Sequence, residues 1–192
     1  NIVRRPLPKK LSGIFDCMRA VDDPLFIGID NPTVVPHSRH NALSSGDLET
    51  CGYQIVSRMP DGDANMFTLR KESLFVYLQG HPEYHSNTLG REYLRDVGRF
   101  LLGQRDVNPG IPLNYFDATT ETALDALRTA GRAQSLLPRY EEIIAAAAVH
   151  HSWHADSVRL FGNWIALVAA EKMRRRSRAN DEAQLTQMRR SA

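Results

Sequence analysis

Residues 74–84 read LFVYLQGHPEY and join an apolar run to a polar segment that contains a proline. The run at 74–80 is apolar on both faces, which is typical of a strand buried in the middle of a sheet. Pro82 ends the hydrogen-bond ladder of such a strand and keeps His81 extended, so that His81 and Glu83 project to the same side. Ligand groups in open α/β sheets gather at the carboxyl ends of strands. A histidine oriented by a carboxylate at this place suits a general base for acyl transfer, and the alternative is a strand-end histidine that only caps a loop.

Three apolar runs that precede this stretch are also predicted strands: LFIGI at 25–29, YQIVSRM at 53–59 and MFTLR at 66–70. The segment DGDAN at 61–65 supplies Gly and Asp for a turn, and KES at 71–73 is short enough for another hairpin connection. We therefore expect neighbouring strands before residue 80.

After residue 84 the apolar residues change to a helical period. A helix is predicted from Thr88, as N-cap, to Gly103, with four apolar positions on one face: Leu89, Tyr93, Val97 and Leu101. A long loop is expected to follow, before a second helix that begins at Pro138. A third helix is expected over 157–172, with four residues facing a core: Val158, Phe161, Ile165 and Val168. Strands interleaved with helices predict an α/β layer architecture.

Other polar clusters give weaker signals. Ser38 lies in PHSRH at 36–40 without the GxSxG context of a nucleophile, so local hydrogen bonds or a polar substrate contact are the interpretations that remain. Arg91, Arg95 and Arg99 form a stripe that by default is a solvated face, although one arginine of such a stripe is able to clamp a carboxylate.

The sequence predicts no metal and no nucleotide cofactor. His150 and His154 have the i, i+4 spacing of a zinc face, but the glutamate of HExxH is absent and no third ligand is indicated. Neither GxxxxGK[ST] nor GxGxxG, the glycine patterns that cradle phosphates, occurs in the chain.

Composition places the chain among soluble globular proteins. Its 192 residues include 24 Lys plus Arg, 22 Asp plus Glu and two cysteines, Cys17 and Cys51, which we interpret as incidental thiols of a reducing, cytoplasmic compartment. No run reaches the 18 apolar residues of a membrane span, so neither membrane insertion nor secretion is expected. Seven of the basic residues but only two of the acidic ones lie in 172–192, which leaves residues 1–171 with a net charge of −3. We expect a domain over 1–171 followed by a basic tail over 172–192, and this distribution does not favour nucleic-acid binding.

Several motifs occur in an order that resembles the homoserine O-acyltransferases of the homoserine O-succinyltransferase type, relatives of class I glutamine amidotransferases. The segments that carry the resemblance are LPKKLSGIF (7–15), PLFIGID (24–30), VPHSRH (35–40), LQGHPEYHSNTLGREYLRD (78–96), IPLNYF (111–116) and SWHADSVRLFGNW (152–164). The resemblance implies an α/β, flavodoxin-like three-layer sandwich, of which this chain is the C-terminal part. It also implies transfer of a succinyl or acetyl group from acyl-CoA to the hydroxyl of L-homoserine, in methionine biosynthesis, with acyl-CoA as co-substrate and no cofactor.

The resemblance also implies roles for individual residues. His81 is the expected base and Glu83 its catalytic partner, while Lys10, Ser38 and Arg95 are expected to bind substrate. The family works through an acyl-thioester on a cysteine in a strand-to-helix elbow before the KLSG motif, and neither Cys17 nor Cys51 stands in such an elbow.

We therefore expect a missing N-terminal portion that carries the nucleophile, in a homodimeric enzyme. The chain departs from the family at His40, His85 and His154 and over 117–151, and these departures bear on substrate choice more than on fold. Two alternatives stay open: a non-catalytic subunit or fragment of the same fold, and an acyltransferase that acts on another hydroxy amino acid such as serine.

Overall fold

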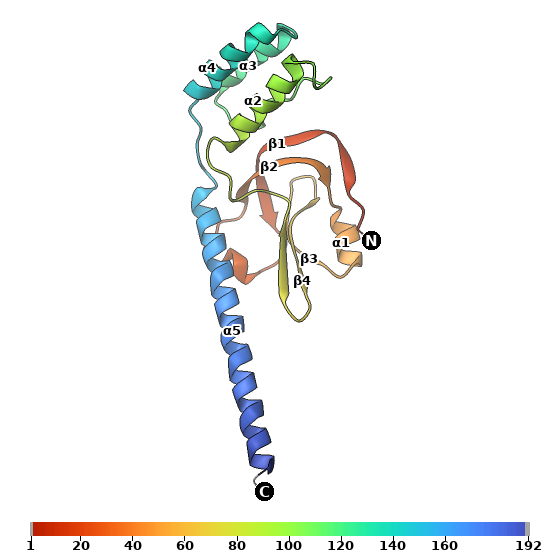
Figure 1. Cartoon of the computed structure of the whole chain (residues 1–192), viewed down its shortest axis with the longest axis vertical. Coiled ribbons are helices and arrows are strands. Elements are labelled where there is room, and N and C mark those ends of the chain that lie inside the picture. Colours follow the sequence, from red (N-terminus) through yellow and green to blue (C-terminus); the bar gives the residue numbers. More distant parts are fainter. Residues whose placement is uncertain (1, 191–192) are drawn as a thin grey trace.

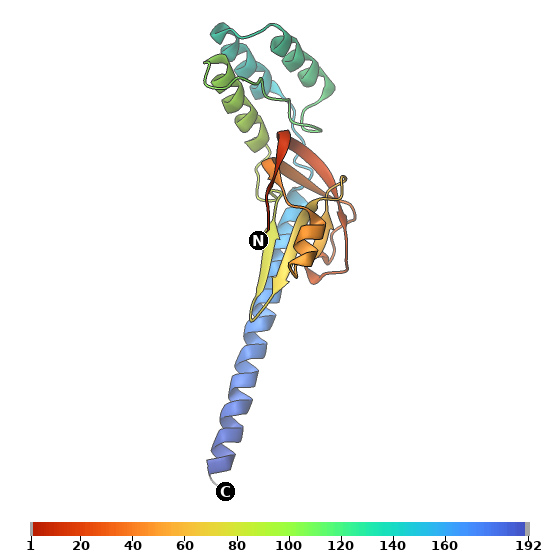
Figure 2. The ribbon, with the colours of Figure 1, turned by 90° about the vertical axis from the view of Figure 1, so that its right-hand side faces the viewer.

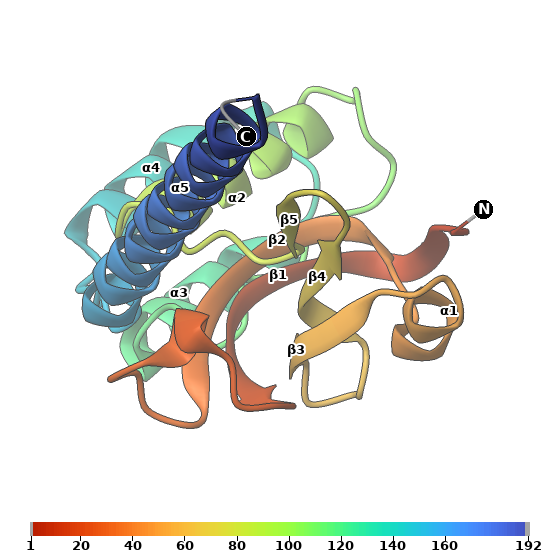
Figure 3. The same ribbon diagram turned by 90° about the horizontal axis from the view of Figure 1, so that it is seen from below.

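One curled antiparallel sheet is at the centre of the computed structural model, which describes residues 2–190. Its strands are β1 (Arg5–Arg19), β2 (Thr33–Ala42), β3 (Gln54–Arg58), β4 (Ala64–Arg70) and β5 (Leu74–Leu78), in the order β2-β1-β3-β4-β5. The long strand β1 pairs with β2 over most of its length and with β3 only at its end, through Met18 and Arg19. The sheet therefore bends along β1, as Figure 3 shows.

The helices lie on two sides and at one end of this sheet (Figures 1 and 3). They are α1 (Ser45–Thr50), α2 (Thr88–Leu101), α3 (Ala118–Thr129), α4 (Leu137–Ala146) and α5 (His154–Arg190), with short 3-10 turns η1 (Pro24–Phe26) and η2 (Gln134–Leu136). Helices α2, α3 and α4 gather at one end of the sheet, whereas α5 runs past the sheet and projects beyond its other end (Figures 1 and 2). Across the part of the chain that the structure describes, no helix is long and apolar enough to cross a membrane.

The main hydrophobic core lies between α2, α3, α4 and β1. All four residues of the predicted α2 face are buried in it, which confirms the register of that helix. Its N-cap is Asn87 and not the predicted Thr88, which is the first helical residue. Trp153, Tyr140 and Leu124 are also buried in this core. The predicted helix at Pro138 is confirmed as α4, with Pro138 in its first turn. The predicted loop after residue 103 gives way to α3 at Asp117, whose side chain accepts the N–H of Thr120 at 2.9 Å.

Two predictions about strands are wrong, and two strands were not predicted. The run at 25–29 forms η1 and a turn, because Pro24 begins a helical turn, Asp23 caps it, and Gly28 has a positive φ of 69°. Strands β1 and β2 were not expected, since Gly13 and Pro36 interrupt their apolar pattern. The run at 74–80 contains a strand, as predicted, but not a central one.

Strand β5 instead lies at the edge of the sheet. It pairs with β4 alone among the described residues, and Phe75, Tyr77 and Leu78 are exposed. Apolar residues on both faces of a strand predict that the strand is buried, but they do not identify the elements that bury it.

Helix α5 also differs from its prediction. Val158, Phe161, Ile165 and Val168 are exposed, not buried in a core. The side of α5 that packs against η1 and the sheet carries Leu160 and Leu167. This orientation is fixed by the carboxamide of Asn163, which donates hydrogen bonds of 2.9 Å to the carbonyls of Leu25 and Ile27, in and directly after η1. Helix α5 continues without a break through residue 171, where the sequence predicts the boundary between a domain and a basic tail. That boundary stays a prediction. The α/β class is confirmed, and the mixed architecture is consistent with a flavodoxin-like α/β fold.

Candidate functional site

The loop after β5 brings the GHPEY residues against β2. Gly80 has no room for a side chain, because a Cβ there would lie 2.9 Å from His37 Nε2 and from Asn65 Oδ1. The next backbone N–H, that of His81, donates to the carbonyl of Pro36 at 2.8 Å. The loop then turns, with the Tyr84 N–H donating to the His81 carbonyl at 3.1 Å. These constraints fix His81 at the end of β5.

His81 and Glu83 project together, as their spacing predicts. His81 Nδ1 lies 2.8 Å from Glu83 Oε1, and the imidazole stacks on the ring of Tyr84 with centroids 4.4 Å apart. With Nδ1 engaged by the carboxylate, Nε2 is the nitrogen left to take a proton from a ligand. The Glu83 carboxyl is 67% exposed, so this pair adds little to stability, and its main effect is to orient the imidazole.

A second cluster lies on the sheet-facing side of α2. Glu92 and Asp96, one helical turn apart, point toward β1 and β2. Lys10 Nζ lies 2.9 Å from Asp96 Oδ2 and 3.4 Å from Glu92 Oε2. The Ser38 hydroxyl donates to Glu92 Oε2, and the Arg95 guanidinium contacts Asp96 Oδ1 at 3.0 and 3.1 Å. The structure thus brings together Lys10, Ser38 and Arg95, which come from three different elements.

Hydrogen bonds and nearby cations keep both carboxylates ionised. Burial by itself would raise the pKa of Glu92, but the hydrogen bond from Ser38 and the charge of Lys10 outweigh it, so that this pKa lies below its usual range. Burial likewise opposes ionisation of Asp96, but Lys10 and, to a smaller extent, Arg95 lower the pKa of Asp96. Arg105 adds a third cation 3.5 Å from Asp96. The second cluster therefore holds two ionised carboxylates beside cations that are able to bind a ligand.

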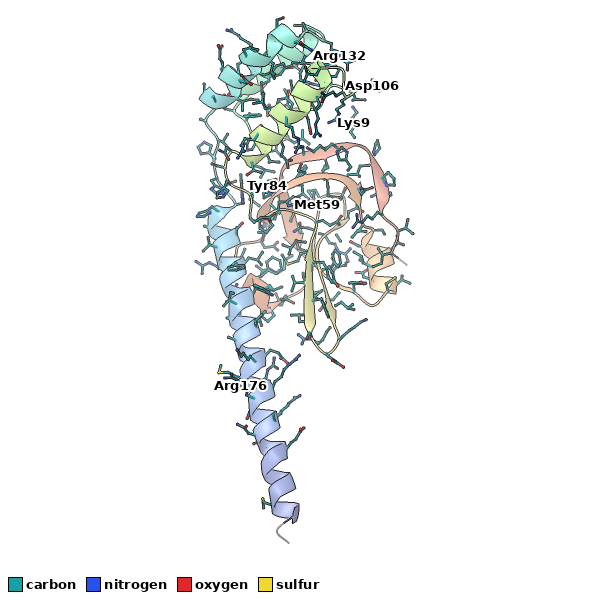
Figure 4. All side chains as sticks on the ribbon, viewed as in Figure 1. Lys9, Met59, Tyr84, Asp106, Arg132 and Arg176 are labelled. Carbon is teal, nitrogen blue, oxygen red and sulfur yellow. The ribbon has the colours of Figure 1, made fainter. Side chains whose placement is uncertain are left out.

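Tyr84 joins the two clusters. Its ring stacks on His81 and its hydroxyl donates to Glu92 Oε1 at 3.0 Å. The backbone carbonyl of Tyr84 is held by the indole N–H of the buried Trp153 at 2.9 Å and by His151 Nε2 at 3.1 Å. Figure 4 places Tyr84 between the helical end of the molecule and the sheet.

A close backbone approach positions β1. Gly13, with φ of 147°, lies so near Leu113 that a Cβ would be 2.6 Å from the Leu113 nitrogen. The Ile14 N–H donates to the Leu113 carbonyl, and the Leu113 N–H to the Ser12 carbonyl, both at 2.9 Å. Ser12 in turn pairs with Ser38 across β1 and β2. The Leu113 segment thus fixes the strand pair that carries Lys10 and Ser38.

The cysteines lie elsewhere. Cys17 is fully buried on β1, with Sγ 3.6 Å from Met59 Sδ and 3.9 Å from His37 Nε2. Burial, with Asp16, raises its pKa to about 12, which disfavours the thiolate that a nucleophile requires. Cys51 is exposed where α1 ends.

Among residues 2–190 no cluster of three or more His, Cys, Asp or Glu side chains is arranged to hold a metal ion. The histidine pair of interest for zinc, His150 and His154, does not form one: His154 begins α5, while His150 precedes it outside any helix.

Sequence reasoning missed Tyr84, Glu92, Asp96 and Arg105. Two acidic residues at i, i+4 on an otherwise amphipathic helix are a signal that was present in the sequence. Their cationic partners were not visible, because Lys10 and Arg105 approach from distant parts of the chain.

Comparison with known proteins identifies relatives over most of the chain. The family model described as homoserine O-succinyltransferase matches residues 1–174. Proteins named homoserine O-succinyltransferase from Rhodopseudomonas palustris and from Methylorubrum extorquens are each 39% identical to this chain, over 89% and 88% of its length. One from Allochromatium vinosum is 34% identical over 86% of it. The matched regions make up 52%, 52% and 48% of those proteins, so the chain spans about half the length of these relatives.

Proposed function

Because the chain belongs to the homoserine O-succinyltransferase family, we propose that it supplies the acceptor side of an enzyme that transfers a succinyl group from succinyl-CoA to the hydroxyl of L-homoserine. The observation that carries this proposal is the convergence of two clusters on Tyr84: a carboxylate-oriented imidazole on one side, and a Lys, Ser and Arg group around two carboxylates on the other. The succinyl group is preferred over acetyl because the relatives are named for it.

His81 acts as the general base in this proposal. Glu83 holds Nδ1–H, so that Nε2 removes the proton from the substrate hydroxyl as the oxygen attacks the carbonyl carbon of an acyl-thioester. The carbon–sulfur bond breaks, the sulfur leaves as thiolate, and the succinyl ester is released. Glu83 stabilises the imidazolium until the proton returns to the thiolate.

The thioester is proposed to lie on a cysteine outside this chain. Cys17 has no route to that role, since it is buried and its pKa is raised to about 12. The N-terminal portion that the family resemblance implies is the proposed source of the nucleophile.

The second cluster is proposed to hold the amino acid. Arg95 is half exposed, so its guanidinium is free to exchange part of its contact with Asp96 for the substrate carboxylate, which it binds in a bidentate manner. Glu92 remains anionic and faces the substrate ammonium, while Ser38 and Lys10 keep the Glu92 carboxylate in place. The homodimer and the cytoplasmic location implied by the resemblance stay predictions.

The test uses a chimera in which this chain replaces the matched half of the R. palustris relative. We expect His81→Asn to lower kcat by about 10²–10⁴-fold, as is usual for loss of a general base. His150→Asn, at an exposed histidine outside the site, serves as the matched control and should leave kcat unchanged. An unchanged kcat in the His81→Asn chimera would contradict the proposal.

Substrate choice is measured in the same chimera. Steady-state rates with homoserine and serine, each against succinyl-CoA and acetyl-CoA, should be highest for homoserine with succinyl-CoA. A folded chimera without any transfer would support the alternative of a non-catalytic subunit.

A further inference from the structure

Three consecutive residues of β2 hold the backbone of Gly80 and His81. A Cβ at Gly80 would lie 2.4 Å from Val35 Cγ1 and 2.9 Å from His37 Nε2, so the loop backbone is in direct contact with both side chains. The His81 N–H donates to the carbonyl of Pro36, which lies between them, at 2.8 Å. The place of the proposed base therefore depends on β2 as well as on its own loop.

His37 is an unusual residue for this position, because its imidazole is fully buried. Its Nε2 lies 3.9 Å from the sulfur of Cys17, and its Nδ1 has no hydrogen-bond partner among the described residues. Asn65, also buried, reaches the same point of the loop: its Nδ2 donates to Ser57 Oγ at 3.1 Å, and its Oδ1 would lie 2.9 Å from a Cβ at Gly80. A buried polar group without a partner costs stability, and folded proteins keep such groups mainly where function requires them.

The surroundings of His37 keep its imidazole neutral. Burial, with the charges of Arg39 and His81, lowers the pKa of His37 to about 3. The buried Cys17 thiol is neutral as well, and Met59, labelled in Figure 4, covers it with a second uncharged sulfur 3.6 Å away. The titratable groups that face His37 are Arg39 on its own strand, Cys17 on β1 and His81 in the loop after β5. A protonated His37 would repel the imidazolium that forms on His81, so a neutral imidazole suits this place.

We propose that His37 and Asn65 are positioning residues for the acyl transfer: their buried side chains form a support for Gly80, and this support sets where the His81 imidazole stands. The inference rests on the proposed function, since it concerns the base that takes the proton from the acceptor hydroxyl. Glu83 orients the ring of His81, whereas the support fixes the backbone that carries it. A misplacement of about 1 Å costs about 10²-fold in rate, so loss of the support should lower kcat without weakening the binding of homoserine.

Kinetics in the chimera measure this effect. His37→Ala should lower kcat at least about tenfold, with KM for homoserine changed by less than about twofold. His37→Gln, whose carboxamide nitrogen replaces Nε2 against Gly80, should restore most of the lost kcat. Val56→Ala is the matched control, because Val56 is fully buried in a different core cluster. This variant loses stability without touching the loop, and its kcat per folded molecule should stay unchanged.

Nitrogen-15 NMR of the full chain tests the support without any transfer. In the unmodified chain, neutral His81 should occupy a single tautomer with the proton on Nδ1, as its contact with the Glu83 carboxylate requires. His37→Ala should give a mixture of the two tautomers, because the displaced ring loses part of that contact, whereas His37→Gln should keep the single tautomer. A chimera that transfers no acyl group removes the proposed function, and the tautomer of His81 still decides whether the support exists.

A second variant acts on the support from the other side. If His37→Ala does not fold, Gly80→Ala provides the comparison: Gly80 has no positive φ, so the added methyl acts only through its contacts with Val35, His37 and Asn65. It should lower kcat and mix the tautomers of His81 in the same way.

Two results would overturn the proposal. One is a folded His37→Ala or Gly80→Ala chain in which His81 keeps the unmodified tautomer and kcat of the chimera is unchanged. The other is a loss of kcat in His37→Ala that Val56→Ala matches and His37→Gln does not restore, because the cause would then be lost stability alone.

Discussion

Replacing Asp96 by asparagine removes the negative charge around which the second cluster is arranged. The carboxylate is only 5% exposed and contacts Lys10, Arg95 and Arg105 at 2.9, 3.0 and 3.5 Å. The carboxamide of the variant would keep the shape of the side chain but would donate N–H groups toward cations. Lys10, itself 12% exposed, would then keep only Glu92 as its anionic partner at 3.4 Å.

The expected cost follows from how buried the partners are. Breaking a fully buried ion pair by removing one partner costs about 3–5 kcal/mol. Arg95 is half exposed and recovers water, and Glu92 still compensates Lys10, so we expect Asp96→Asn to lower the free energy of unfolding by about 2 kcal/mol. The Asp96 pKa is lowered in the folded state, so this contribution is present above the ordinary carboxyl pKa of 3.8 and is lost as the pH falls below it.

Urea unfolding of the chain, followed by tryptophan fluorescence, measures this free energy. A double-mutant cycle with Lys10→Met should give a coupling energy of about 1–2 kcal/mol. Asp125→Asn is the control, because Asp125 pairs with Arg128 at the surface and its loss should cost less than about 0.5 kcal/mol. If Asp96→Asn is as mild as Asp125→Asn, or shows no coupling to Lys10, the description of the cluster is wrong.

Three further predictions concern other parts of the site. Gly13→Ala should destabilise the chain by about 3 kcal/mol in urea unfolding, because its Cβ meets the Leu113 backbone and disrupts two hydrogen bonds; a loss no larger than that of Gly110→Ala, which has open space, would contradict this. Burial, with Arg39, lowers the pKa of His37 from 6.5 to about 3, so stability should be lost as the pH falls through this range by up to about 1.4 kcal/mol per pH unit, and His37→Asn should flatten that slope. In the chimera, Tyr84→Phe should raise KM for homoserine about tenfold with kcat nearly unchanged, since the ring still stacks on His81; an unaltered KM would remove Tyr84 from the substrate site.

Local patterns were sufficient for much of the fold. The period of Leu89, Tyr93, Val97 and Leu101 specified α2 because one face of that helix packs on a single core. The predicted strands over 53–59 and 66–70 correspond to β3 and β4, although β4 begins two residues earlier, inside the predicted turn at 61–65. Helix α5 was found but its buried face was not, since that face depends on hydrogen bonds from Asn163 to a turn more than 130 residues away in sequence.

The candidate site likewise has one part that local spacing predicts and another that depends on distant segments of the chain. The pairing of His81 with Glu83 depends on residues two apart and followed from Pro82 and extended geometry. The convergence of Lys10 and Ser38 on α2 depends on the register of β1 and β2 and on the contact of Gly13 with Leu113, 100 residues later. Resemblance to a family supplied those residues, whereas their spacing in the sequence did not.

The role of His81 as the base for the acceptor hydroxyl is tested most directly by following the acyl group itself. The His81→Asn chimera is incubated with succinyl-CoA, homoserine is added, and the covalent succinyl adduct is followed by intact mass spectrometry. If His81 is this base, the adduct persists in the variant, whereas it disappears within one turnover in the unmodified chimera. Loss of the adduct to homoserine at the unmodified rate would contradict it.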